Sequence, residues 1–219
     1  MRASLKHITG PLVESNPVTL QILGICSALA VTTSVATALT MSLALTAVLV
    51  AASAVISAIR RHIPASIRLI LQITIVASMV IVIDLFLQAF AFQLSQRLSI
   101  FVSLIVTNCV VLGRAEAFAM RNPMGASMLD ALGNGLGYSA VLLLVGAVRE
   151  LLGVGALLGY PILPTVATGG WFVPLGVMLL APSAFFILGL LIWALRTWRP
   201  EQTEPDEFPI VVEPDGARL

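Results

Sequence analysis

Two cysteines, Cys26 and Cys109, are the residues of this sequence whose type and position point to chemistry. Each lies inside an apolar segment, and the chain contains no third cysteine. Two thiols are too few for a disulfide framework. Three uses remain: packing as small buried hydrophobic residues, one disulfide, or ligation of a metal. Thiolates would persist in hydrocarbon only where a metal compensates their charge.

Polar residues accompany both cysteines. Ser27 follows Cys26, while Thr107 and Asn108 precede Cys109. These side chains, or nearby backbone N–H groups, could donate hydrogen bonds to sulfur and tune a bound metal. The alternative is that Ser27 and Thr107 bond their own backbone, as serine and threonine commonly do in helices.

Three charged residues in or beside apolar segments are further candidates. Arg114 and Glu116 follow Cys109 by five and seven residues, and we expect them at the cytoplasmic interface. There they would act as structural anchors or as docking contacts for a soluble redox partner. Asp84 lies toward the far end of an apolar segment. Two interpretations of Asp84 are open. It lies at a solvated helix end or pairs with an arginine, or it belongs to an ion path.

The composition places the chain in a bilayer. Of 219 residues, 58% are hydrophobic and 11% charged, whereas soluble domains carry about 25% charged residues. Membrane lipid is therefore an expected partner. Nucleic acid is not, because no basic block is interleaved with aromatic residues. Residues 1–17 lack the uninterrupted apolar core of a cleaved signal peptide, so we expect no cleavage.

Six apolar segments predict an all-α integral membrane protein with six transmembrane helices, of which the first and fourth are short or broken. The expected spans are about Val18 to Val35, Ala36 to Ile59, Ile67 to Phe92, Leu98 to Gly113, Leu129 to Val148 and Phe172 to Leu195. Residues 18–199 would form this domain. An N-terminal tail, 1–17, precedes it, and an acidic, proline-rich tail, 200–219, is predicted to be disordered.

The fifth segment contains two motifs. Its glycine series, from Gly133 to Tyr138, predicts close helix packing in lipid. A phosphate loop is the weaker interpretation, because no strand precedes the series and no Lys-Ser/Thr follows it. Arg149 and Glu150 are expected to close the span.

Basic residues orient the chain. With both termini in the cytoplasm, ten lysines and arginines fall inside, whereas only Arg97 and Arg149 fall outside. An excess of basic residues is typical of cytoplasmic loops. We therefore expect cytoplasmic N- and C-termini.

The segments form two similar sets, about 18–92 and 98–199, each with a short cysteine-containing segment followed by two long helices. An odd number of spans inverts the second set, so the fold is expected to contain two inverted three-helix repeats. Discontinuous segments at matching positions of such repeats indicate a site near the bilayer midplane. Cys26 and Cys109 would meet there from opposite faces. A cluster with four thiolate ligands would need two more from a partner of similar build.

The motifs TNC at 107–109 and GRAEAFA at 113–119 resemble the integral membrane subunits shared by Na+-translocating NADH:quinone reductases and the related Rnf electron-transfer complexes. Supporting stretches are CSALAVTT at 26–33, GNGLGY at 133–138, RELLG at 149–153, GGW at 169–171 and LAPSAFF at 180–186. The resemblance covers about residues 6 to 200. Within this family the chain is most similar to the D subunits, with the Rnf E subunits next.

The resemblance implies one component of an obligate complex of six, A to F, in the bacterial inner membrane. It would pair with the pseudo-symmetric E subunit, each contributing two cysteines, here Cys26 and Cys109, to an intramembrane [2Fe-2S] cluster. The family passes electrons from NADH toward quinone and couples this flow to Na+ movement. FAD, FMN, riboflavin and the quinone site belong to other subunits, so this chain would not be catalytic alone.

Other functions stay open at this point. An Rnf-type ferredoxin:NAD complex has a similar cysteine layout, and the choice rests on residues 133–138 and 169–186. A secondary transporter with inverted repeats belongs to a different class. It would place Asp84 or Asn108 on its substrate path and would work without cysteines. A structural scaffold would also dispense with both thiols.

Overall fold

The structure, a computed structural model, describes residues 17–18, 21–64, 66–90, 102–158, 160–161 and 173–198. Its elements, in chain order, are α2 (Ile25–Val31), α3 (Val35–Ile59), the 3-10 turn η1 (Arg60–His62), α4 (Arg68–Phe90), α6 (Val102–Val106), α7 (Cys109–Arg114), the π-helical turn η2 (Ala115–Ala119), α8 (Met124–Val154), strands β1 (Ala156–Leu157) and β2 (Tyr160–Pro161), the 3-10 turn η4 (Gly176–Leu179) and α9 (Ala181–Trp198). The two strands form a short antiparallel hairpin.

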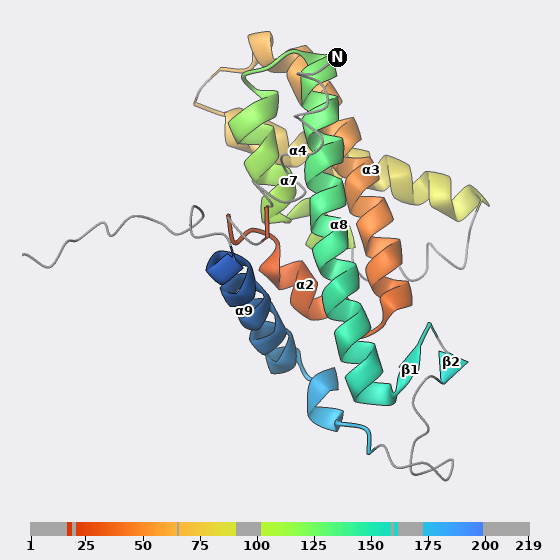
Figure 1. Cartoon of the computed structure of the whole chain (residues 1–219). Coiled ribbons are helices and arrows are strands. Elements are labelled where there is room, and N and C mark those ends of the chain that lie inside the picture. Colours follow the sequence, from red (N-terminus) through yellow and green to blue (C-terminus); the bar gives the residue numbers. More distant parts are fainter. Residues whose placement is uncertain are drawn as a thin grey trace, which may run out of the picture.

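Helices α3 and α8 lie antiparallel and side by side at the centre (Figure 1). Helices in lipid gain little from hydrophobic burial against each other, so small residues that allow close approach favour their association. A Cβ atom at Gly135 would lie 2.8 Å from the side chain of Thr46, and one at Gly146 would lie 3.3 Å from the Cβ of Ala38. The glycine series of α8 therefore serves helix packing, as the sequence predicts.

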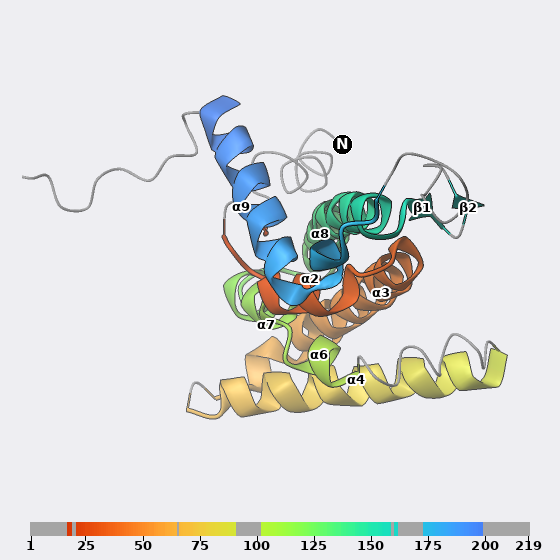
Figure 2. The same cartoon turned by 90° about the horizontal axis from the view of Figure 1, so that it is seen from below.

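Helices α4 and α9 lie on two different sides of this centre (Figure 2). Both expose large apolar side chains: Ile70 and Phe86 on α4, and Phe186 and Trp193 on α9. Exposed apolar surface of this extent suits lipid or another membrane subunit. Four of the described helices are long and apolar enough to cross a bilayer, namely Val35–His62, Arg68–Phe86, Met124–Val154 and Ala181–Trp198.

The bounds predicted for the second and third spans agree with α3 and α4 to within two residues. The sixth span was predicted to begin near residue 172, and this is wrong, because α9 begins at Ala181. Residues 173–175 are not helical, and η4 follows them. Pro182 explains the late start, since proline lacks an N–H group and is tolerated only in the first turn of a helix.

The first and fourth segments contain only short helices. Helix α2 has 7 residues, and α7 has 6. A break at residues 107–108 separates α6 from α7. Starting from a common level, α2 runs toward one end of the α3–α8 pair and α7 runs toward the other (Figure 1). These breaks agree with the prediction of two interrupted segments. Residues 91–101 and the predicted tails, apart from Pro17, lie outside the described residues.

Arg149 and Glu150 do not close the fifth span, because α8 continues to Val154 and both residues are buried. The guanidinium of Arg149 donates hydrogen bonds to Thr32 Oγ1 at 2.6 Å and Leu29 O at 3.3 Å, both near the end of α2. It also donates to the carbonyls of residues 178 and 179, in η4, and of residue 180, just before α9. A fully buried arginine thus joins α2, α8 and α9 through carbonyl groups that lipid could not satisfy.

Glu150 caps the start of the neighbouring helix, α3. Its Oε2 accepts a hydrogen bond of 2.6 Å from the backbone N–H of Val35, the first residue of α3. A carboxylate at this position also interacts favourably with the positive end of the helix dipole.

Replacing Gly135 with valine should destabilise the α3–α8 pair by about 1–3 kcal/mol, the usual effect of overpacking. To give way, the Thr46 side chain would have to leave the position in which its hydroxyl donates to Ser42 O at 2.7 Å. Unfolding of the purified protein in mixed detergent micelles measures the change. Gly189→Val is the matched control, since a Cβ at Gly189 would meet no atom of the described residues within 4 Å. Equal stability of the two variants would contradict the close packing.

Replacing Arg149 with glutamine should also destabilise the protein. A hydrogen bond from a charged group contributes about 1.5–3 kcal/mol, so losing two or more should lower the stability by at least about 3 kcal/mol in the same assay. The exposed Arg61→Gln variant is the control, and a surface change of this kind typically stays within about 0.5 kcal/mol. An Arg149→Gln protein as stable as the control would show that the buried bonds are not formed.

Candidate functional site

The two cysteines, far apart in sequence, line the same cleft, which has a volume of about 140 Å³. Cys26 lies in the first turn of α2, and Cys109 is the first residue of α7. The cleft is therefore built where the two interrupted segments meet. Its lining residues are Gly24, Cys26, Ser27, Leu104, Thr107, Asn108 and Cys109.

Gly24 forms the wall of the cleft beside Cys109. Its backbone N–H donates a hydrogen bond of 2.8 Å to Cys109 Sγ. The residue has φ of 81°, a left-handed conformation that glycine adopts readily. A Cβ here would lie 2.8 Å from the ring of Tyr138 and 3.0 Å from Val110. Both the backbone conformation and the close approach therefore require glycine.

Asn108 fixes the second break. Its Oδ1 accepts a hydrogen bond of 2.9 Å from the N–H of Val110 and so caps α7. Its Nδ2 donates to Ser27 Oγ at 3.0 Å. One buried side chain therefore caps α7 and ties it to Ser27 of α2, the residue after Cys26.

Ser27 lies at the centre of these contacts. Its hydroxyl donates to Gly24 O at 2.8 Å and lies 2.5 Å from the hydroxyl of Tyr138, a side chain with no exposed surface. The sequence left open whether side chains or backbone N–H groups would bond to sulfur. In the structure the Gly24 N–H does so, and Ser27 bonds the backbone and two side chains. Tyr138 was singled out in the sequence only as part of the glycine series.

The donor set fits half of a metal centre. Two thiols converge on the cleft, a backbone N–H points at one sulfur, and Cys26 is exposed at the surface of the chain. Thiolates are metal ligands, and an N–H group aimed at a ligand sulfur is a typical neighbour of such a ligand. The described residues contain no group of three or more His, Cys, Asp or Glu side chains able to hold a metal. A centre with more ligands would have to be completed through the open side.

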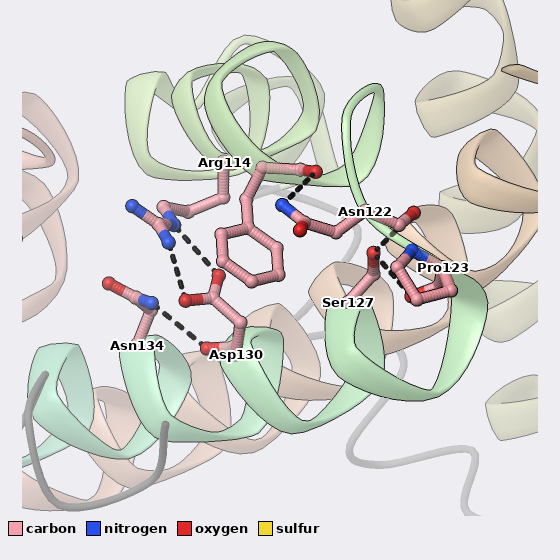
Figure 3. A network of polar contacts seen from close by, with 7 residues as sticks. Arg114, Asn122, Pro123, Ser127, Asp130 and Asn134 are labelled. Atoms are coloured by element: carbon pink, nitrogen blue, oxygen red, sulfur yellow. Dashed lines mark hydrogen bonds and ion pairs between the residues drawn. The ribbon is translucent and has the colours of Figure 1, made fainter. Parts of the chain in front are cut away.

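Arg114 lies inside the fold rather than free at an interface. It forms a bidentate ion pair with Asp130 of α8, with Nε 2.9 Å from Oδ2, and both side chains are largely buried (Figure 3). Its guanidinium lies 5.3 Å from the ring centroid of Phe118. The importance of Asp130 was not predicted from the sequence. The signal was available, because Asp130, Asn134 and Tyr138 recur every four residues and share one face of α8.

Glu116, on the π-helical turn η2, binds two side chains of α4. It pairs with Arg68 at 2.6 Å and accepts a hydrogen bond of 2.8 Å from Gln72 Nε2. Both charged residues after Cys109 thus have partners within the chain. Of the two interpretations left open by the sequence, these contacts support structural anchoring.

Asp84 belongs to a different part of the molecule. It is half-buried on α4 and accepts a hydrogen bond of 3.0 Å from Gln88 Nε2. It is not among the residues that line the cysteine cleft, whereas Asn108 is. The two residues proposed for a transport path therefore do not share this cleft.

Comparisons with known proteins give a consistent result. Residues 4–192 match the family described as "Rnf-Nqr subunit, membrane protein". The chain is 58% identical over 197 residues to the D subunit of the Na(+)-translocating NADH-quinone reductase of Shewanella oneidensis, covering 90% of this chain and 94% of the relative. It is 56% identical over 200 residues to the corresponding D subunit of Psychromonas ingrahamii, covering 91% and 95%.

The shared cleft predicts that a short bifunctional thiol reagent will bridge Cys26 and Cys109. Dibromobimane becomes fluorescent when both of its arms react, so the metal-depleted protein should fluoresce. Cys26→Ser and Cys109→Ser should each abolish the signal, because each leaves a single thiol. Fluorescence that persists in either variant, or is absent from the parent protein, would contradict the convergence of the two thiols.

Proposed function

Because the chain belongs to the Rnf-Nqr family of membrane subunits, we propose that it is the D subunit of a Na+-translocating NADH:quinone oxidoreductase and relays electrons across the membrane. Its relatives are named as that component, and the similarity extends over nearly their whole length. The enzyme is multisubunit, and this chain supplies one membrane part of it. An equivalent role in an Rnf-type complex is the alternative within the same family.

The electron-carrying group in this proposal is a [2Fe-2S] cluster, with Cys26 and Cys109 supplying two of its four thiolate ligands. The observation that carries it is the convergence of both thiols on one cleft between two helix breaks. Such a cluster, when bound, supplies one-electron transfer.

The chain's own residues would hold and tune that centre. The Gly24 N–H, 2.8 Å from Cys109 Sγ, stabilises negative charge on sulfur. Hydrogen bonds to cluster sulfurs are among the factors that set the reduction potential. Asn108 keeps the second break in place by capping α7 and bonding to Ser27.

The remaining ligands are proposed to come from the pseudo-symmetric E subunit. Cys26 is exposed, so the cleft is accessible from outside the chain. Two thiols per chain and two homologous chains give the four ligands that a [2Fe-2S] cluster takes. The whole complex would contain six subunits, A to F, with FAD, FMN, riboflavin and the quinone site on the others.

We also propose that the fold contains two inverted three-helix repeats, α2–α3–α4 and α6/α7–α8–α9. The interrupted helices occupy the same place in each set, and α3 and α8 are antiparallel (Figure 1). Inverted repeats with such interruptions are typical of sites at the membrane midplane.

The proposed orientation places both termini in the cytoplasm of a bacterial cell, with the chain in the inner membrane. The basic turn η1 and the loop before α8 lie at one end of the structure, where Ser57 Oγ donates to Asn122 O at 2.7 Å. Arg60, Arg61 and Arg121 belong to these two segments, and basic residues concentrate on the cytoplasmic side.

Iron analysis of the purified complex tests the cluster. Cys26→Ser and Cys109→Ser should each remove about two irons per complex, with their acid-labile sulfide and the EPR signal of the dithionite-reduced centre, because serine oxygen replaces a thiolate ligand. NADH-to-quinone electron flow should fall with them. Ser78→Ala is the control, since that hydroxyl is exposed and donates to Thr74 O of its own helix at 2.8 Å.

Unchanged iron, sulfide and EPR signal in both cysteine variants would rule out ligation by these residues. If the variants retain both electron flow and iron, the two cysteines serve only in packing. A cysteine variant could also lose iron because the complex fails to assemble. The subunit content of the purified complex distinguishes this case from loss of a ligand.

A further inference from the structure

Tyr138 is a fully buried residue in the middle of α8, and its hydroxyl points at the cleft residues rather than at lipid. A buried tyrosine hydroxyl needs a hydrogen-bond partner. Its partner is Ser27 Oγ, 2.5 Å away, on the residue after Cys26. A side chain on the second repeat thus contacts the turn that carries the first cysteine.

The hydrogen-bond capacity of Ser27 fixes the direction of this contact. A serine hydroxyl has one proton and two acceptor lone pairs. The proton goes to Gly24 O at 2.8 Å, and Asn108 Nδ2 donates into one lone pair at 3.0 Å. The second lone pair is left for Tyr138, which therefore donates. Ser27 then uses its full capacity, and its neighbours hold it in the position from which it restrains the carbonyl of Gly24.

The ring of Tyr138 acts on the same residue from another side. It packs so closely on Gly24 that an added Cβ would lie 2.8 Å from Cε2. Gly24 is the residue whose N–H donates to Cys109 Sγ. The ring supports the Gly24 backbone, while the hydroxyl holds its carbonyl through Ser27.

From these contacts we infer that Tyr138 is a positioning residue that holds the Gly24 N–H on Cys109 Sγ and thereby sets the reduction potential of the proposed centre. The inference rests on the proposed function. An N–H bond to sulfur stabilises the extra negative charge of a reduced centre. Loosening it lowers the potential without removing a ligand.

The test is a redox titration of the purified complex, followed by EPR, with Tyr138→Phe. This change removes the hydroxyl and keeps the ring. We expect unchanged iron and subunit content, a midpoint potential shifted to lower values and altered g values. Tyr160→Phe is the matched control, because Tyr160 is 77% exposed on β2, and it should leave all of these unchanged.

A second variant, Ser27→Ala, breaks the hydrogen-bond chain from the Tyr138 hydroxyl to Gly24 O and leaves the Tyr138 ring unchanged. It should shift the potential in the same direction. Because the hydroxyl of Tyr138 acts through Ser27, the double variant should shift no further than the larger single shift. A double-mutant cycle measures this coupling directly. Should Tyr138→Phe fail to assemble, the Ser27→Ala potential alone decides the outcome.

The outcomes are distinct. A parent complex with no iron–sulfur signal overturns the proposed function and this inference with it. A normal parent signal that neither Tyr138→Phe nor Ser27→Ala changes overturns the inference alone. Shifts that add in the double variant overturn the route through Ser27.

Discussion

A helix that breaks inside a bilayer releases backbone N–H and C=O groups that lipid cannot satisfy, and the rest of this structure depends on how those groups are paired. Most breaks have a buried polar side chain beside them. Asn108 caps the start of α7, Glu150 the start of α3, and Arg149 binds the carbonyls before α9. The buried charges of Arg149 and Glu150 are thus a consequence of broken helices.

The start of α2 is paired differently, because the N–H of Gly24, its N-cap residue, donates to the sulfur of Cys109. The need to pair backbone groups at helix ends therefore also accounts for the N–H group that points at Cys109 Sγ. Interrupting two helices at one level exposes both cysteines to a common cleft, which two continuous helices would not provide. Close packing of α3 on α8 leaves this region on one side of the central pair (Figure 2).

Long, uninterrupted apolar runs made α3 and α4 predictable from the sequence, and the two-fold pattern of segments led to the meeting of Cys26 and Cys109. Side-chain partners across helices were not predictable. Hydropathy describes how a segment interacts with lipid and does not indicate which face meets another helix. Arg149 accordingly resembled an interfacial anchor, although it is fully buried. The spacing of Asp130, Asn134 and Tyr138 marks one polar face of α8, but it does not indicate that Arg114, on a different helix, is the partner of Asp130.

The most direct measurement is a high-resolution electron cryomicroscopy map of the complete complex, focused on this cleft. Strong density for a two-iron cluster, bonded to the sulfurs of Cys26 and Cys109 and to two ligands from a neighbouring membrane protein of the complex, is the predicted result. A cleft filled by lipid or side chains, with the two sulfurs facing apart, would contradict the account.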